Sequence, residues 1–123
     1  TKALGPYQGT GGFVLRAWAQ KNSDVLVRYT QGYIEGLRWM MTPANRDAAI
    51  KLLAERVKLP PHIAAQAYAI QTDPVEGLPK DAAFNLEGFR NVLKLRAEFE
   101  GGAVAAPERY YDLTWYKKAL AGL

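Results

Sequence analysis

Hydrophobic residues recur every three or four positions over most of this chain, a spacing that places them on one face of a helix. The longest such stretch begins at Ser23, whose hydroxyl is suited to cap a helix. The pattern therefore predicts a helix over 23–41 with its two tyrosines in the buried stripe. The recurring apolar residues of this stripe are Leu26, Tyr29, Tyr33, Leu37 and the pair Met40-Met41.

Four further helices follow from local signals. Thr42-Pro43 and Pro60-Pro61 each open a helix, because proline is welcome in the first helical turn. Asn85 is a strong N-cap residue, and Asp112 is suited to the same role near the C-terminus. The predicted helices cover 43–57, 61–72, 86–99 and a short segment after Asp112, with a loop over 73–84.

The first 22 residues differ from the rest, because a glycine-rich loop, GPYQGTGG, leads into an apolar segment. This segment predicts a short strand at about 11–17. An isolated strand leaves its backbone donors and acceptors without partners. The segment must then pair with another chain, pair with a second copy, or be helical. The predicted fold class is mainly α, about five helices with one or two short N-terminal strands.

Composition is compatible with one ordinary folded domain of 123 residues, of which 49% are hydrophobic and 23% charged. We therefore expect a single region over 1–123, divided into a glycine-rich loop and strand over 1–22 and a helical part over 23–123. The net charge of +4 is small and its basic residues are dispersed. We expect no nucleic-acid partner, because such proteins cluster their basic residues on one face.

Few residues are suited to catalysis. The chain has no cysteine, one histidine, His62, and one serine, Ser23. A thiolate metal site and a thiol nucleophile need cysteine, which the chain lacks. A Ser-His triad is not expected either, because no histidine lies near Ser23 in the sequence and helix capping explains this serine. We therefore expect no enzyme, no metal and no cofactor. No apolar run is long enough to span a bilayer, and residues 1–8 do not have the pattern of a signal peptide.

Tyr7 and Gln8 are the strongest candidates for ligand contact. They lie in the glycine-rich stretch, where the backbone can approach a small molecule closely. A purely structural turn explains the same residues.

The order of several short motifs resembles the C-terminal part of ABC-transporter substrate-binding proteins of the nitrate/sulfonate/taurine type, a superfamily that includes the thiamine-pyrimidine precursor synthases. The resemblance covers nearly all of this chain and only the later part of a family member. The motifs are YQGT, RAWAQKNSD, WMMTPANRDAAIKLLAE, KLPPHIAAQAY, NLEGF and YYDLTWYKKAL.

This resemblance implies the C-terminal portion of a two-lobed α/β periplasmic-binding-protein type II fold. It also implies a periplasmic setting, a small organic or anionic solute as ligand, and an ABC permease as membrane partner. Carried onto this sequence, it places Tyr7, Gln8 and Thr10 near the ligand.

Two alternatives remain beside solute binding. One is a stand-alone helical protein-interaction module that uses the tyrosine stripe of helix 23–41. The other is the enzyme branch of the same superfamily, which needs more cysteine and histidine than this chain contains. Because helix faces suited to cover a sheet would be left open, we also expect a homodimer or a swapped assembly, with residues near 11–17 pairing between chains.

Overall fold

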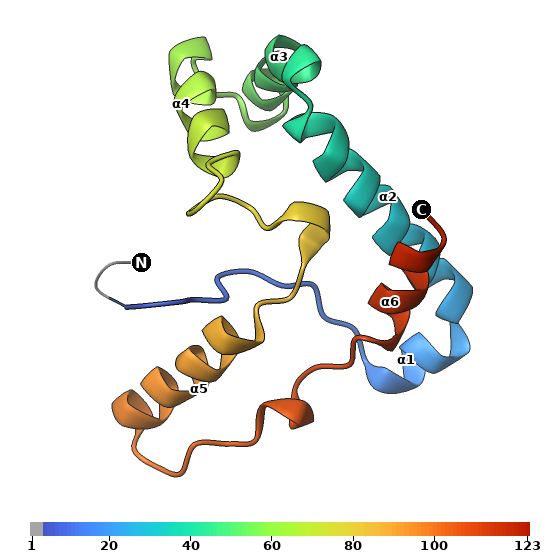
Figure 1. The fold of residues 1–123 in the computed structure, drawn as a ribbon, viewed down its shortest axis with the longest axis vertical. Helices are drawn as coiled ribbons and strands as arrows, with labels where there is room; N and C mark the ends of the chain where they lie inside the picture. The colour runs from blue at the N-terminus through green and yellow to red at the C-terminus, as the bar shows by residue number, and fades with distance from the viewer. Residues whose placement is uncertain (1–3) are drawn as a thin grey trace. The chain divides into compact units, whose positions relative to one another are not determined.

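The computed structural model describes residues 4–123, and within them it contains six α-helices and three short 3₁₀ turns (Figure 1). Helices account for about two thirds of the chain, 67%. The 3₁₀ turns lie at Pro43–Asn45, Lys80–Ala82 and Pro107–Arg109. The α-helices are α1 (Arg16–Lys21), α2 (Ser23–Met41), α3 (Arg46–Val57), α4 (Pro61–Gln71), α5 (Leu86–Glu100) and α6 (Thr114–Ala121).

The α/β fold class predicted from the sequence is wrong, because no strand occurs within residues 4–123. Residues 11–15 have no regular secondary structure, and Arg16 already begins α1. A strand is stable only when a neighbouring strand pairs with its backbone. Phe13 and Leu15 are 96% and 80% exposed, so the apolar segment is not covered within this chain.

The positions of the main helices are confirmed to within a few residues. Asn85 caps α5 as predicted, since its side chain accepts a hydrogen bond from the Gly88 N–H at 2.9 Å. The capping role predicted for Ser23 is wrong. Ser23 is the first residue inside α2, and its hydroxyl accepts a hydrogen bond from Trp115 Nε1 at 3.1 Å.

The chain forms two compact units, of which the first contains residues 4–30 and 84–123. Its buried side chains are small or aliphatic, and they come from α1, α5 and α6. Four aromatic rings pack together beside α5, with centroid separations between 5.0 and 6.4 Å. The four rings belong to Phe84, Phe89, Tyr110 and Tyr111.

The second unit contains residues 31–83, and its main packing is that of α3 against α4. Ile34 is fully buried in it, and the buried Tyr68 hydroxyl donates a hydrogen bond to the Met40 carbonyl at 2.9 Å. Arg38 Nε donates to Asp81 Oδ1 at 2.7 Å, which attaches the turn at Lys80–Ala82 to α2.

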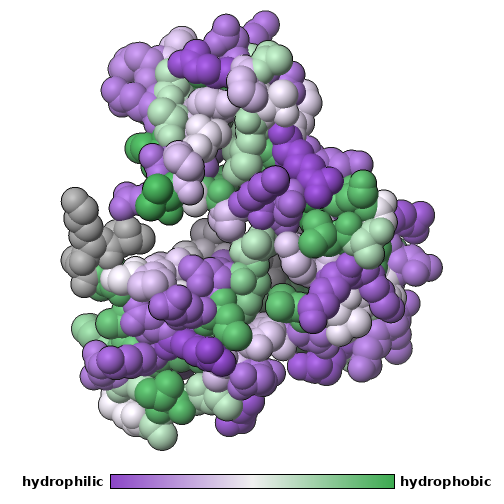
Figure 2. All heavy atoms as spheres, viewed as in Figure 1, coloured by the Kyte–Doolittle hydropathy of each residue, from purple (hydrophilic) through white to green (hydrophobic). Residues whose placement is uncertain are grey.

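The predicted buried stripe of α2 is confirmed at Leu37, which is buried, and is wrong at its two tyrosines. Tyr29 is 72% exposed and Tyr33 is also exposed, whereas Ile34, which the predicted stripe left out, is buried. Many other large apolar side chains of the described residues reach the surface, and Figure 2 shows several as green patches. Among residues 4–123, no helix combines the length and the apolar character needed to cross a lipid bilayer.

Candidate ligand-binding site

The residues predicted to contact a ligand lie in an extended segment that runs against α5. Asn91 holds this segment, because its Nδ2 donates to the carbonyl of Leu4 and to that of Pro6, the latter at 2.9 Å. Asn85, Gly88 and Asn91 follow one another at intervals of three residues. In a helix this interval places them on one face, so that face of α5 receives the segment.

Gly88 permits the main chain of the segment to approach α5 closely. It is buried, and a Cβ placed on it would come within 2.8 Å of both the Gln8 nitrogen and the Tyr7 carbonyl carbon. A Cβ atom essentially never lies within 3.0 Å of a backbone atom of another segment. Any other residue at position 88 would therefore displace the segment.

Gln8 is committed to main-chain contacts at both ends of its amide. Its Nε2 donates to the Thr10 carbonyl at 2.6 Å, and its Oε1 accepts a hydrogen bond from the Asn85 N–H at 2.9 Å. The second contact satisfies a backbone donor just ahead of α5. The geometry thus favours the structural interpretation of Gln8 that the sequence left open.

Tyr7 lines a shallow hollow of about 510 Å³. This volume lies within the range of small-molecule pockets, about 300–1,000 Å³. Tyr7 itself is 46% exposed, so its ring is accessible from solvent. The other residues around the hollow are Leu4, Val92, Leu95, Arg96, Glu98 and Phe99.

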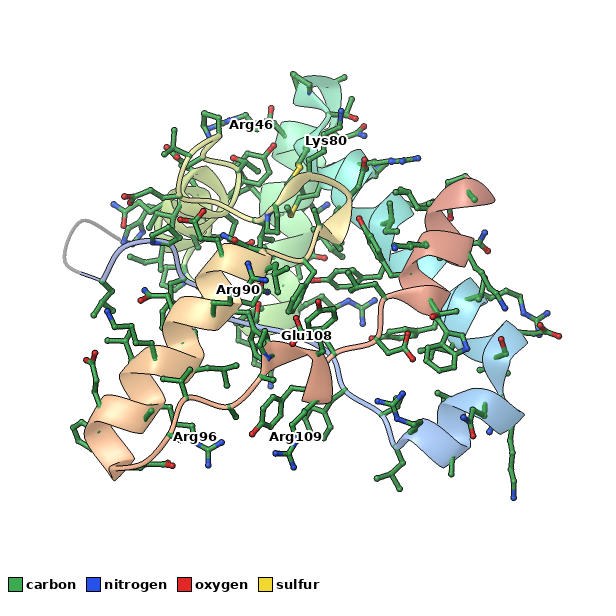
Figure 3. The ribbon with its side chains drawn as sticks, turned by 60° about the horizontal axis from the view of Figure 1, so that its bottom comes forward. Arg46, Lys80, Arg90, Arg96, Glu108 and Arg109 are labelled. Atoms are coloured by element: carbon green, nitrogen blue, oxygen red, sulfur yellow. The ribbon has the colours of Figure 1, made fainter. Side chains whose placement is uncertain are left out.

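The charges at the hollow are largely balanced. Arg96 lines the hollow and projects from α5 nearer its C-terminal end than Arg90, which does not line it (Figure 3). Arg96 Nε donates to Glu100 Oε2 at 2.8 Å, and this hydrogen bond raises the pKa of the guanidinium. Because that cation already has an anionic partner, the hollow is mainly an apolar surface with a compensated charge at its edge.

The structure thus gives the three predicted residues different surroundings. Tyr7 borders the hollow, Gln8 is bonded to the main chain, and Thr10 is exposed and offers its carbonyl to Gln8. Sequence reasoning missed Gly88 and Asn91, which hold the segment. A glycine inside the predicted helix 86–99 was the available signal, because such a glycine often marks a close backbone approach.

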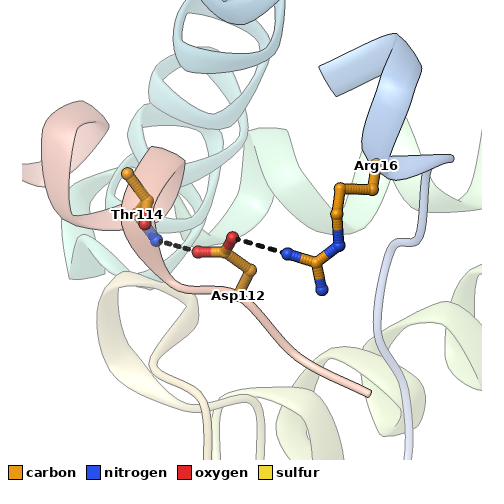
Figure 4. Close-up of polar contacts among 3 residues, drawn as sticks. All are labelled: Arg16, Asp112 and Thr114. Atoms are coloured by element: carbon orange, nitrogen blue, oxygen red, sulfur yellow. Dashed lines mark hydrogen bonds and ion pairs between the residues drawn. The ribbon is translucent and has the colours of Figure 1, made fainter. Parts of the chain in front are cut away.

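A second polar contact of the same unit joins α1 to the start of α6. Asp112 Oδ2 accepts a hydrogen bond from Arg16 Nη1 at 3.3 Å, and Asp112 Oδ1 accepts one from the Thr114 N–H at 2.9 Å (Figure 4). The bonds from Thr114, first its side chain and then its N–H, lower the pKa of Asp112, and Arg16 acts in the same direction. The N-cap position of α6 is Leu113 and not the predicted Asp112, although the Asp112 side chain does bond the N–H of the first helical residue.

No cluster of potential metal ligands occurs within residues 4–123, and the lone imidazole of His62 is exposed. Comparison with known proteins finds no matching family model, no similar curated protein and no similar solved structure.

Proposed function

We propose that this chain is a region of the solute-binding component of an ABC importer, and that it binds a small organic solute at the Tyr7 hollow. The observation that carries the proposal is the accessible Tyr7 ring at the rim of a hollow of pocket size. The motif order described above supports the importer assignment. The protein is then a periplasmic carrier that delivers its ligand to a permease in the membrane, and it has no catalytic role.

Among the solutes that the resemblance implies, the site favours an organic molecule with an apolar or aromatic part. Leu4, Val92 and Leu95 offer hydrocarbon surface beside the Tyr7 ring. A nitrate or a small sulfonate binds most strongly to a cation whose charge is not already compensated. Here Glu100 accepts a hydrogen bond from Arg96 Nε and compensates its charge, and both ends of the Gln8 amide bond the main chain.

Calorimetric titration of the purified chain with four solutes tests this proposal. The solutes are an aminopyrimidine, an aromatic carboxylate, taurine and nitrate. We expect the two ring compounds to bind, and the exchange Tyr7→Ala to weaken that binding at least tenfold because it removes an aromatic wall. Tyr29→Ala is the matched control, since Tyr29 is an exposed tyrosine outside the hollow.

Three results would contradict the proposal. The first is the absence of binding by every solute at millimolar concentration. The second is tighter binding of nitrate or taurine than of the ring compounds. The third is an equal loss of affinity in Tyr7→Ala and Tyr29→Ala, since this places the ligand elsewhere.

The second candidate function is that of a helical protein-interaction module. The exposure of Tyr29 and Tyr33 favours it, because tyrosine is enriched at protein interfaces. A photoreactive residue introduced at position 29 should then form one discrete adduct in cells, whereas the same residue at exposed position 62 should not. Equal labelling at both positions would contradict this function.

A further inference from the structure

We propose that Gly88 and Asn91 are positioning residues of the ligand site: together they hold the main chain of residues 4–8 on α5 and thereby determine where the Tyr7 ring lies. This inference rests on the proposed function in one respect, namely that the Tyr7 hollow is where a solute binds. We call Asn85, Gly88 and Asn91, the residues of α5 and its cap that receive this segment, the seat. Neither Gly88 nor Asn91 borders the hollow itself.

The first part of the seat is Gly88, whose lack of a side chain leaves room for the main chain of the segment. At Gly88 the Tyr7 carbonyl carbon and the Gln8 nitrogen both occupy space that a Cβ would need. The glycine therefore acts directly at the peptide bond that follows the Tyr7 side chain. Displacing this peptide bond by even one ångström moves the ring that borders the hollow.

The second part of the seat is a double contact by one amide. Asn91 Nδ2 carries two N–H groups, and it donates to the carbonyls of Leu4 and Pro6. Both carbonyls belong to residues that precede Tyr7 in the chain, whereas the Gly88 contact lies at the peptide bond that follows Tyr7. The segment is thus held both before and after Tyr7.

Local rigidity does not explain the placement of the segment. Gly9, Gly11 and Gly12 follow it directly, and a Cβ added at Gly11 or Gly12 would meet nothing within 4 Å. Glycine loses more conformational freedom on ordering than any other residue. A segment followed by such residues stays in place only if a specific contact holds it, and the seat supplies that contact.

The test compares Gly88→Ala with Gly32→Ala and Gly36→Ala in the full chain. All three exchanges add one methyl group inside a helix, but only at position 88 would the methyl group meet main-chain atoms, since Gly32 and Gly36 have open space. We expect Gly88→Ala to accelerate amide hydrogen exchange of residues 5–10 at least tenfold. It should also move the Tyr7 ring resonances toward those of an unstructured tyrosine. The two controls should change neither.

A second variant keeps the test decisive if Gly88→Ala disturbs α5. Asn91→Asp keeps the side-chain shape but replaces both N–H donors by an acceptor at neutral pH. It should release the segment at pH 7, and lowering the pH until the new carboxyl is protonated should restore part of the protection, because that group then donates one hydrogen bond. A purely structural defect would not recover on acidification.

The same samples, titrated with the aminopyrimidine, separate this inference from the proposed function. A loss of affinity of at least fivefold in Gly88→Ala and in Asn91→Asp at pH 7, with none in the controls, supports both. Release of the segment with unchanged affinity overturns the positioning role and leaves the binding function standing. If the unaltered chain binds no probe but the variants still release Tyr7, the binding function fails and the placement of Tyr7 by the seat holds. Unchanged exchange rates and ring resonances in both variants overturn the inference.

Discussion

At the scale of single residues, Asp112 shows how one carboxylate connects segments far apart in the chain. It bonds Arg16, 96 residues away, and the Thr114 N–H within its own turn. Because these contacts favour its ionised form, the pKa of Asp112 is lower in the folded chain than in the unfolded one. The stabilising contribution is therefore fully present above the ordinary pKa of aspartate, and it is lost as the pH falls through the depressed value.

We predict that the start of α6 loosens on acidification before the rest of the unit unfolds. The Thr114 amide resonance should follow the titration of Asp112 at a pH below the ordinary aspartate pKa. Asp112→Asn should remove this acid step, because the amide cannot ionise. Glu98→Gln serves as the control, since Glu98 lies on α5 and pairs with Lys94. A Thr114 resonance that titrates identically in Asp112→Asn would contradict the prediction.

At the scale of elements, a buried hydroxyl attaches α4 to the end of α2. Tyr68 is buried on α4, and its hydroxyl donates to the Met40 carbonyl. The last carbonyls of a helix have no partner within the helix, so a donor from another element satisfies one of them. This contact joins two residues that are 28 positions apart in the sequence.

We predict that Tyr68→Phe lowers the free energy of unfolding by about 1 kcal/mol, the usual net contribution of one hydrogen bond. The loss reaches up to about 3 kcal/mol if no water replaces the hydroxyl at the Met40 carbonyl. Urea denaturation followed by circular dichroism measures the change. Tyr29→Phe is the matched control, because the Tyr29 side chain is mostly exposed, and it should change the stability by less than about 0.5 kcal/mol. Equal effects of the two exchanges would contradict the assigned role of Tyr68.

At the scale of the whole molecule, the chain leaves much apolar surface uncovered. Phe13, Val75 and Phe99 are almost fully exposed, and the large side chain that is fully buried among the described residues is Ile34. Burial of apolar surface is worth roughly 25 cal/mol per Å², so contact between such surfaces is favourable. The homodimer or swapped assembly expected from the sequence therefore stays a prediction with a physical reason.

We predict that the chain associates as its concentration rises, through the segment around residues 11–15. Phe13→Asp should shift the association to at least tenfold higher concentration, because it places a charge in the contact. Val75→Asp, an exchange at a valine that is 88% exposed in the other unit, should leave the association unchanged. Light scattering over a concentration series measures the assembly. A monomer at every concentration, or equal effects of the two exchanges, would contradict the prediction.

Local chemistry was enough to predict most helices. Pro61 opens α4, Asn85 caps α5, and the three- and four-residue spacing marks α2, because these signals act between residues close in the chain. The lack of cysteine likewise excluded thiol chemistry before any fold was considered. For the candidate site, the sequence alone pointed to Tyr7, and the structure places this residue at a hollow. That Tyr7 contacts a ligand stays a prediction.

Tertiary structure alone decided the features that depend on distant residues. Residues 11–15 are apolar enough for a strand, but a strand needs a neighbour, and none occurs among the described residues. Gln8 was suited to a ligand or to a structural role, and its hydrogen bonds to the Thr10 carbonyl and to the N–H of Asn85, 77 residues away, favour the structural role. Helical spacing marks several overlapping stripes on α2, so packing decided that Ile34 is buried and Tyr29 is not. A local pattern states what a segment is able to form, and contacts between distant segments select which of those forms is stable.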